Sequence, residues 1–321
     1  MVQNLINRYS LIGLYYCISS RFSSKLFLNK NQLRVLDCST CDWFTDTCTK
    51  IISENCPGLE SISLVRCCNI QGYYLKELVE NCNGLKTVLL GGTRIVDDAV
   101  SRIDWKNSCI TELDIINCYR LGADALSAVL PNLPSLRYLR CAITDEVLHQ
   151  MYSGFPELSL LHLHRRYPIT VEAVKNLLLF CPGITCLDIS SIPLACVHFE
   201  TFLPSMPLLK SINFAGNELL GTERIVNALG NFCPHLKTIS INYYHSSDDE
   251  EIKIAFSTLM KKCRNLKTVI LSGLYVTDLV REIQEFATKN ICTRKPLRVY
   301  ENEHFRLPKP ILSLDNFMRM E

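Results

Sequence analysis

Two histidines, His162 and His164, are separated by a single leucine and stand out as side chains that can bind metal. Residues at i and i+2 of a strand face the same way, so both imidazoles are expected on one face. Cys186 and Asp188 occupy outward positions of the next expected strand. All four are zinc-ligand types, but a flat strand surface separates them and nothing in the spacing fixes a tetrahedral arrangement. We therefore predict no metal and no cofactor.

Motifs of the common catalytic centres are missing from the sequence. The phosphate-loop pattern, the nucleophile elbow and the HExxH zinc motif do not occur, and Gly91-Gly92 lacks the spacing of a phosphate-binding loop. We predict that the chain is not an enzyme.

These side chains lie within a sequence repeat, the apolar phrase L-x-x-L-x-L. It repeats about every 26 residues and begins at Leu33, Leu59, Leu85, Ile110, Leu136, Leu158, Ile184, Leu209, Leu236, Leu266 and, in degraded form, Leu297. A period in this range is typical of leucine-rich repeats, whose single coils cannot bury their apolar face alone. The prediction is an α/β leucine-rich-repeat solenoid of about ten to eleven coils, a curved horseshoe with a parallel sheet on its concave face and helices on its convex face.

Within each phrase the first, fourth and sixth residues are expected to point into the coil, and the residues between them outward. Between phrases the apolar spacing becomes helical. Thr-Asp pairs such as Thr45-Asp46 mark helix starts, and Cys-Pro pairs such as Cys56-Pro57 mark helix ends. We predict an N-terminal partial coil or cap at 1–32, the solenoid at 33–296, and a C-terminal cap and tail at 297–321.

Charged side chains gather on the outward positions of the middle coils. Tyr and Arg are enriched at interface hot spots, and solenoids bind partners on this face. The predicted protein-binding residues of the concave face are Glu112, Asp114, Tyr138, Arg140, His162, His164, Arg165 and Asp188. The alternative is that charges on adjacent strands pair with one another in solvent, each pair contributing under about 1 kcal/mol.

A longer interval after Leu236 contains a second candidate contact. Tyr243 and Tyr244 precede an acidic run at 248–251. An exposed aromatic pair there fits a contact loop. The alternative is a solvated turn before a helix, since acids are favourable at helix N-termini.

Charge and cysteine content restrict the partners and the compartment. The 321 residues carry a formal net charge of +2, which lacks the basic excess of a nucleic-acid binder. Six of the 17 cysteines immediately precede the phrase: Cys56, Cys82, Cys109, Cys181, Cys233 and Cys263. Neighbouring helices pack about 8–10 Å apart, beyond the roughly 7 Å limit between the Cα atoms of a disulfide. We predict buried, reduced thiols in a reducing compartment.

Location is constrained by the apolar runs and by the start of the chain. No run reaches the roughly 18 residues of a membrane span, so no membrane partner is expected. Residues 1–36 contain basic and Ser residues but no acid, a composition typical of mitochondrial transit peptides. The alternative for this segment is a partial first coil. The predicted location is cytoplasmic or nuclear, with mitochondrial as the minor alternative.

The unit Cys56-Pro57-Gly58-Leu59-Glu60-Ser61-Ile62-Ser63-Leu64-Val65-Arg66-Cys67 resembles the cysteine-containing repeats of F-box/LRR proteins and their F-box-less relatives. The segment Cys109 to Cys118 matches most of the same pattern. Later coils replace the second cysteine, and no recognisable F-box is present. The resemblance implies substrate recruitment in ubiquitin-ligase pathways.

Together these features predict a protein-interaction module, a substrate-recognition or adaptor protein of SCF-type pathways. Its expected partners are a protein ligand or substrate and a cullin-ligase adaptor, and we expect a monomer. The alternative is a non-ligase scaffold or assembly factor, mitochondrial if the N-terminus is a transit peptide.

Overall fold

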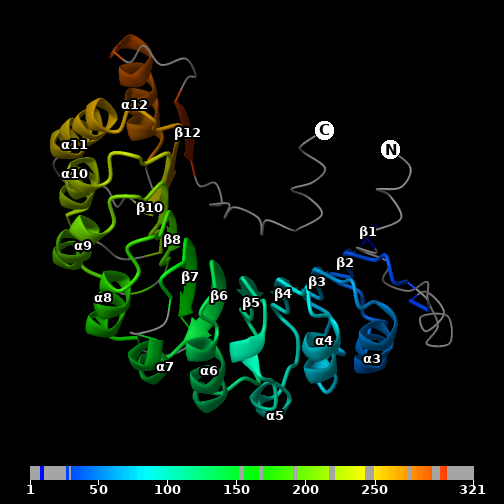
Figure 1. Ribbon diagram of the computed structural model, residues 1–321. Helices are drawn as coiled ribbons and strands as arrows, with labels where there is room; N and C mark the ends of the chain where they lie inside the picture. Colours follow the sequence, from blue (N-terminus) through cyan, green and yellow to red (C-terminus); the bar gives the residue numbers. More distant parts are fainter. Residues whose placement is uncertain are drawn as a thin grey trace. The chain divides into compact units, whose positions relative to one another are not determined.

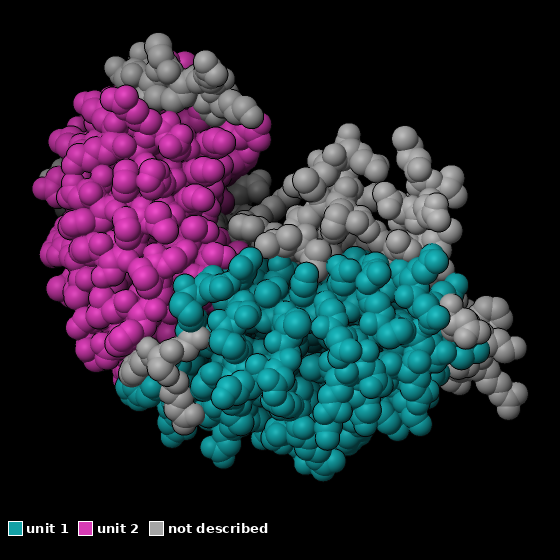
Figure 2. Space-filling model, viewed as in Figure 1, with its two compact units in different colours: residues 1–157, 309–321 teal, residues 158–308 magenta. Residues whose placement is uncertain are grey.

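A computed structural model describes residues 8–10, 27–28, 30–151, 155–165, 169–190, 192, 194–216, 221–242, 249–273, 276–290 and 297–301. This described part forms two compact units, one up to Glu157 and one from Leu158 onward (Figure 2). No helix within the described residues is long and apolar enough to cross a membrane.

Unit 1 is built on parallel strands in chain order: β1 (Arg8–Ser10), β2 (Val35–Asp37), β3 (Ser61–Ser63), β4 (Thr87–Leu89), β5 (Glu112–Asp114) and β6 (Tyr138–Ile143). The register aligns the third, fourth and fifth residues of one phrase with those of the next, as in Asp37↔Ser63 and Asp114↔Arg140. β1 lies before the first phrase and pairs with β2.

The helices of unit 1 all lie on one side of its strands (Figure 1). They are α3 (Asp46–Asn55), α4 (Leu75–Asn81), α5 (Asp97–Ser101), η1 (Trp105–Asn107), α6 (Ala123–Val129), η2 (Leu130–Asn132) and α7 (Asp145–Gln150). The opposite side of the strands is called the outer sheet face below, in either unit.

Unit 2 repeats the arrangement. Its strands are β7 (Leu160–Arg165), β8 (Cys186–Asp188), β9 (Ser211–Asn213), β10 (Thr238–Asn242), β11 (Thr268–Ser272) and β12 (Arg298–Glu301), and its helices are α8 (Val171–Leu179), α9 (Cys196–Phe202), η4 (Leu203–Ser205), α10 (Thr222–Phe232), α11 (Asp249–Lys262) and α12 (Thr277–Asn290). The leucine-rich-repeat solenoid fold is thus confirmed.

The last phrase needs a correction of one residue. β12 pairs with β11 in a register that sets Val299 opposite Val269 and Tyr300 opposite Ile270. Val299, and not Tyr300, therefore holds the fourth phrase position, and the phrase starts before Leu297. A one-residue shift exchanges the two faces of a strand, so the degraded apolar pattern gave the wrong face.

The core lies between the strands and the helices. The fourth-position residues are fully or almost fully buried: Leu36, Ile62, Val88, Leu113 and Leu139 in unit 1, and Leu161, Leu187, Ile212, Ile239 and Val269 in unit 2. Phe199 of α9 packs against Phe214 after β9, with ring centroids 5.1 Å apart. Strand and helix residues thus share one apolar interior, as the phrase predicts.

Strands β2, β3, β4 and β5 are each followed by a left-handed turn at the eighth phrase position. Thr40, Arg66, Gly92 and Asn117 have φ of 62°, 62°, 76° and 58°. The turns are joined by backbone hydrogen bonds: the N–H of Arg66 donates to the carbonyl of Gly91 at 2.8 Å, and that of Gly92 to Ile116 at 2.8 Å. Coil-to-coil bonding therefore requires this conformation even where the residue has a Cβ.

The predicted Thr-Asp helix starts are placed correctly, but the capping differs from the expectation. Thr45 and Thr144 are N-cap residues without a side-chain cap bond, whereas Thr170 accepts from the N–H of Ala173 at 3.3 Å. The carboxylate of Asp46 instead accepts the N–H groups of Gln71 and Gly72 in the next coil, at 2.9 and 2.8 Å. Asp46 joins two coils rather than capping its own helix.

Cysteine thiols form similar links inside the solenoid. The thiol of Cys82 donates to the carbonyl of Cys56 at 3.3 Å, and that of Cys263 to Cys233 at 3.3 Å. Burial raises the pKa of Cys82 to about 12. None of the cysteines that the structure describes forms a disulfide, and the predicted burial holds for Cys56, Cys82, Cys181, Cys233 and Cys263, whereas Cys109 is exposed.

Candidate functional site

Four of the predicted binding residues of unit 1 lie together on the outer sheet face. Glu112 and Asp114 flank Leu113 on β5, and the register sets them opposite Tyr138 and Arg140 of β6. The period-two geometry of the two strands is what points all four side chains to the same face.

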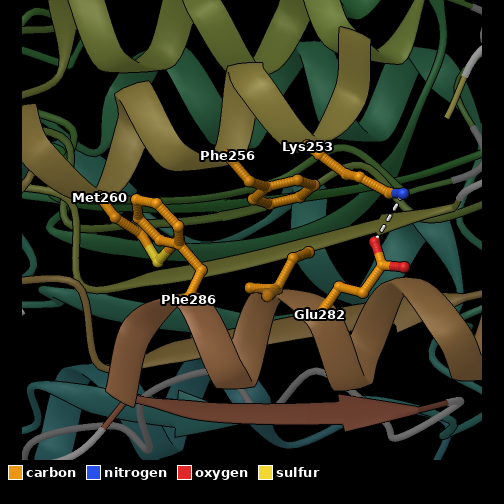
Figure 3. Close-up of a pocket in the computed structure, with 6 residues that line it drawn as sticks. Lys253, Phe256, Met260, Glu282 and Phe286 are labelled. Carbon is orange, nitrogen blue, oxygen red and sulfur yellow. Dashed lines mark ion pairs between the residues drawn. The ribbon is translucent and has the colours of Figure 1, made fainter. Parts of the chain in front are cut away.

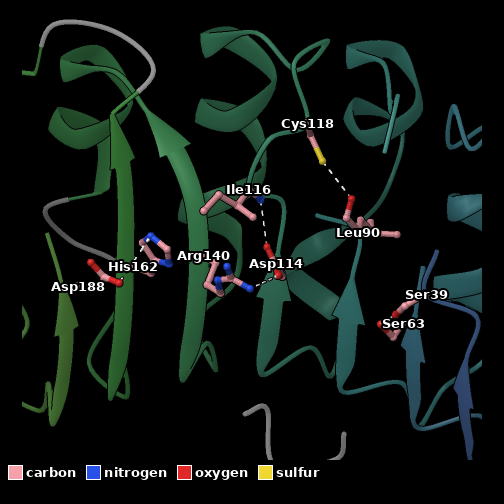
Figure 4. A network of polar contacts seen from close by, with 9 residues as sticks. All are labelled: Ser39, Ser63, Leu90, Asp114, Ile116, Cys118, Arg140, His162 and Asp188. Carbon is pink, nitrogen blue, oxygen red and sulfur yellow. Dashed lines mark hydrogen bonds and ion pairs between the residues drawn. The ribbon is translucent and has the colours of Figure 1, made fainter. Parts of the chain in front are cut away.

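Asp114 and Arg140 form the central contact of this group (Figure 4). Nη1 of Arg140 lies 2.8 Å from Oδ2 of Asp114, and the side chains are 29% and 3% exposed, respectively. The other carboxylate oxygen accepts the N–H of Ile116 at 3.0 Å. Burial raises the pKa of Asp114, and the positive charge of Arg140 acts against that rise. The guanidinium of Arg140 therefore favours the charged form of this carboxylate.

Glu112 and Tyr138 are buried beside this pair. The hydroxyl of Thr87 on β4 donates to Oε2 of Glu112 at 2.8 Å. Burial also raises the pKa of Tyr138, so its phenol stays protonated at neutral pH. Arg140 is thus the member of the group with the most exposed side chain.

In unit 2 the outer sheet face carries a shorter chain of polar contacts. Nε2 of His162 on β7 lies 3.8 Å from Oδ2 of Asp188 on β8. The amide of Asn213 on β9 donates to Oδ1 of Asp188 at 3.1 Å. His162 is 11% exposed at its side chain, and Asp188 6%. The predicted residues His162 and Asp188 are therefore neighbours.

Four predicted contacts cannot be located in detail. His164 and Arg165 belong to β7, but their side chains lie outside the described residues, as do Tyr243 and Tyr244 altogether. Cys186 is buried on β8. Among the described residues no group of three or more His, Cys, Asp and Glu side chains is arranged to hold a metal ion.

A role that the sequence analysis missed concerns the fifth phrase position. The side chains of Asp37, Asp114, Asp188 and Asn213 each accept the N–H of the residue two positions later, at 2.9, 3.0, 3.1 and 3.1 Å. These are Asx turns, which bend the chain out of its strand. The available signal was the recurrence of Asp or Asn at one phrase position just before the turn. Part of the acidic column is therefore structural.

A small groove lies between α11 and α12 in unit 2 (Figure 3). Phe256, Met260, Ile283 and Phe286 line a space of about 160 Å³, and Lys253 pairs with Glu282 across its end at 2.8 Å. Small-molecule sites usually measure about 300–1,000 Å³. The groove is therefore best described as a helix-packing seam held by an ion pair.

Two curated proteins are similar in sequence. F-box/LRR-repeat protein 4 of Bos taurus is 28% identical over 148 residues, which cover 44% of this chain and 24% of that protein. The DNA repair protein rhp7 of Schizosaccharomyces pombe is 24% identical over 268 residues, 79% of this chain and 46% of that protein. The chain resembles the F-box/LRR proteins. The match spans 24% of the length of F-box/LRR-repeat protein 4 and 46% of the length of rhp7. No protein-family model matches it.

Two solved structures share the fold of this F-box/LRR-like chain. Rad7 in its yeast complex with Elc1 superposes with a TM-score of 0.53 at 17% identity, over 88% of this chain and 83% of that chain. The leucine-rich repeat-containing protein LegL7 of Legionella pneumophila gives a TM-score of 0.50 at 17% identity, over 86% of this chain and 97% of that one. At such identities the likeness shows the fold alone.

Proposed function

We propose that the chain is a protein-interaction module of a ubiquitin-ligase pathway that binds a protein substrate through its outer sheet face, in the cytoplasm or nucleus. The similarity to F-box/LRR-repeat protein 4 and to the DNA repair protein rhp7 supports this class of process. The solenoid fold supports a binding role, because a repeat array presents an extended surface.

The observation that carries the proposal is the Asp114–Arg140 pair. A buried carboxylate holds an arginine whose side chain is still 29% exposed. A guanidinium that is already oriented loses less conformational entropy when a partner binds. Arginine is also among the residues that most often dominate interface energies. We therefore assign Arg140 the main contact in unit 1, with Glu112, Asp114 and Tyr138 supporting it from below.

In unit 2 we assign the corresponding role to His162. Its imidazole is positioned next to Asp188, which is itself fixed by Asn213 and by the N–H of Ser190. His164 and Arg165 follow on the same strand and extend this proposed contact. Tyr243 and Tyr244 stay proposed as a second contact loop.

The solved complex of Rad7 with Elc1 supports a second proposed partner. By analogy we propose that this chain also associates with an adaptor protein of a cullin ligase. The chain covers only part of each relative. That it acts within a larger assembly with ligase activity is therefore also a proposal.

The test is affinity purification of the tagged full chain from cultured cells, followed by immunoblotting for cullin adaptors and by mass spectrometry. We expect an adaptor in the wild-type eluate and in the Arg140→Gln eluate, with the substrate depleted only in the latter. Glutamine is preferred to glutamate because a second carboxylate would face Asp114. Arg137→Gln is the matched control, since Arg137 forms an exposed pair with Glu157 at 2.7 Å.

Absence of any adaptor, together with mitochondrial import and removal of the first ~30 residues, would support the scaffold alternative instead. Import is measured by protease protection of isolated mitochondria.

A further inference from the structure

Three arginines and two tyrosines are exposed along the turns that follow β3, β4 and β5 in unit 1. Arg66, Arg94 and Arg120 belong to three successive coils, and all are exposed. Tyr73 is 57% and Tyr119 66% exposed. We call these five residues the arginine edge. It lies on the turns and not on the outer sheet face.

The arginine edge differs from the rest of unit 1 in its ion pairing. The other four arginine side chains that the structure describes in this unit each have a carboxylate partner: Arg34 with Glu60, Arg102 with Asp98, Arg137 with Glu157 and Arg140 with Asp114. No described carboxylate pairs with Arg66, Arg94 or Arg120. Three positive charges on successive coils thus have no ion-pair partner among the residues that the structure describes.

Three acids near these turns are engaged elsewhere, whereas Asp42 and Asp124 are exposed but form no ion pair with the three arginines. Asp46 accepts backbone N–H groups of Gln71 and Gly72, and Asp97 accepts the N–H of Gly122 at 2.7 Å. Asp98 pairs with Arg102 within α5. The edge therefore keeps its positive charge available for a partner.

Backbone hydrogen bonds between coils fix the turns that carry Arg66 and Arg94. The N–H of Arg66 bonds to Gly91, and the N–H of Arg94 bonds to Ile70, at 2.8 and 2.9 Å. A Cβ on Gly92 would lie 3.3 Å from Cγ of Arg66, so the side chain of Arg66 crosses the next coil at this glycine. Coils are about 5 Å apart at the strands and about 8–10 Å apart at the helices. The three arginines stand at the eighth, tenth and eleventh phrase positions, so the coil spacing gives only the scale of their separation, which is also that of alternate residues of an extended peptide, about 7 Å.

Arg66 has a left-handed backbone, with φ of +62°, as do Thr40, Gly92 and Asn117 at the equivalent positions of the neighbouring coils. The coil-to-coil hydrogen bonds require this conformation, which fixes where the side chain of Arg66 leaves the turn.

We propose that the arginine edge binds an acidic peptide segment in which Asp or Glu alternates with other residues. Each carboxylate pairs with the guanidinium of one coil, and Tyr73 and Tyr119 add apolar contact beside it. A nucleic acid fits less well, because it carries a phosphate at every nucleotide and most of these would find no arginine on the edge. The proposal is independent of the substrate contact at Arg140.

The test uses the full chain and a fluorescein-labelled peptide, (Ser-Glu)5, in an anisotropy titration. The uncharged peptide (Ser-Gln)5 and a 20-nucleotide single-stranded DNA are the comparison probes. We expect the Glu peptide to bind more tightly than both. The variant carrying Arg66→Gln, Arg94→Gln and Arg120→Gln should bind it about tenfold more weakly, since each exposed ion pair contributes little alone. Arg264→Gln, at an exposed arginine of unit 2, is the matched control and should leave binding unchanged.

Three results would overturn the proposal. The triple variant and the wild type could bind the Glu peptide with equal affinity, or the wild type could bind the Gln and Glu peptides equally well. The wild type could also bind the DNA more tightly than the Glu peptide, with the DNA binding lost in the triple variant. Thermal unfolding of the triple variant guards against a folding defect. If the triple variant unfolds early, the single variant Arg94→Gln, expected to weaken binding about twofold, decides in its place.

Discussion

Asp114 on β5 accepts two bonds at once: one oxygen receives the guanidinium of Arg140 at 2.8 Å, and the other receives the N–H of Ile116 at 3.0 Å. The same carboxylate therefore ends its own strand and orients the arginine of the neighbouring one. A residue predicted as a partner contact proves to have a structural duty as well.

The structural duty predicts how substitutions at position 114 rank. Asp114→Ala removes the acceptor for the Ile116 N–H and leaves a buried donor unpaired, which should lower the free energy of unfolding by about 1–3 kcal/mol. Asp114→Asn keeps an acceptor oxygen, as Asn213 does at the same phrase position, and should cost less than about 1 kcal/mol. Urea denaturation of both variants measures the difference. Equal losses would show that the turn bond contributes nothing.

The raised pKa of Asp114 predicts a pH dependence. Burial shifts this carboxyl above its ordinary value of 3.8, so the folded state holds the proton more tightly than the unfolded state. The contribution of Asp114 to stability is then fully present below pH 3.8 and is lost as the pH rises through the raised value. The free energy of unfolding of the wild type, relative to that of Asp114→Asn, should therefore decrease as the pH rises through the raised pKa. A relative stability that increases with pH would reverse the assigned direction.

Thiol reactivity should separate the buried cysteines from the exposed ones. Burial raises the pKa of Cys56 and Cys263 to about 11 and of Cys82 to about 12, so very little reactive thiolate exists at pH 8. Cys68 and Cys109 are exposed. Brief treatment of the native protein with iodoacetamide, followed by peptide mass spectrometry, should find alkylation at Cys68 and Cys109 well before the buried set. Comparable rates at Cys82 would mean that the coils open readily.

The left-handed turns predict that alanine substitution affects stability differently at two glycines. Gly92 has φ of +76°, and an added Cβ would also meet Arg66, so Gly92→Ala should cost about 1–2 kcal/mol. Gly84 is the matched control, because its Cβ position is open apart from a contact at 3.9 Å with Glu60 and its φ is not positive. Gly84→Ala should be neutral within about 0.5 kcal/mol. Similar midpoints in thermal unfolding for both variants would contradict the importance of the turn.

Much of the fold could be predicted because one physical pattern determines it. The period-two alternation fixes the face of each strand, and the period of about 26 residues fixes which residues align, so Asp114 and Arg140 could be placed side by side from the sequence. The pattern failed at β12, where too few aliphatics remain to fix the face. The sequence pattern assigned Tyr300 to the buried fourth position, which Val299 occupies in the structure.

The polar chemistry of the site was harder to predict. Sequence spacing shows that Asp46 precedes a helix, but not that its carboxylate reaches Gln71 and Gly72 in the next coil. Nor does it show that Asp114 is 3% exposed while Arg140 is 29% exposed. Such differences arise from the close packing of neighbouring coils, which a phrase repeat does not encode.

The most direct test of the proposed binding face is quantitative capture of cellular proteins by the tagged chain, measured by mass spectrometry for Arg140→Gln, His162→Asn and the control Arg137→Gln. We expect the first two variants each to lose the same captured protein by several fold while their melting temperatures match the wild type. Full retention of every captured protein by both variants, or an equal loss in Arg137→Gln, would contradict a binding role for the outer sheet face.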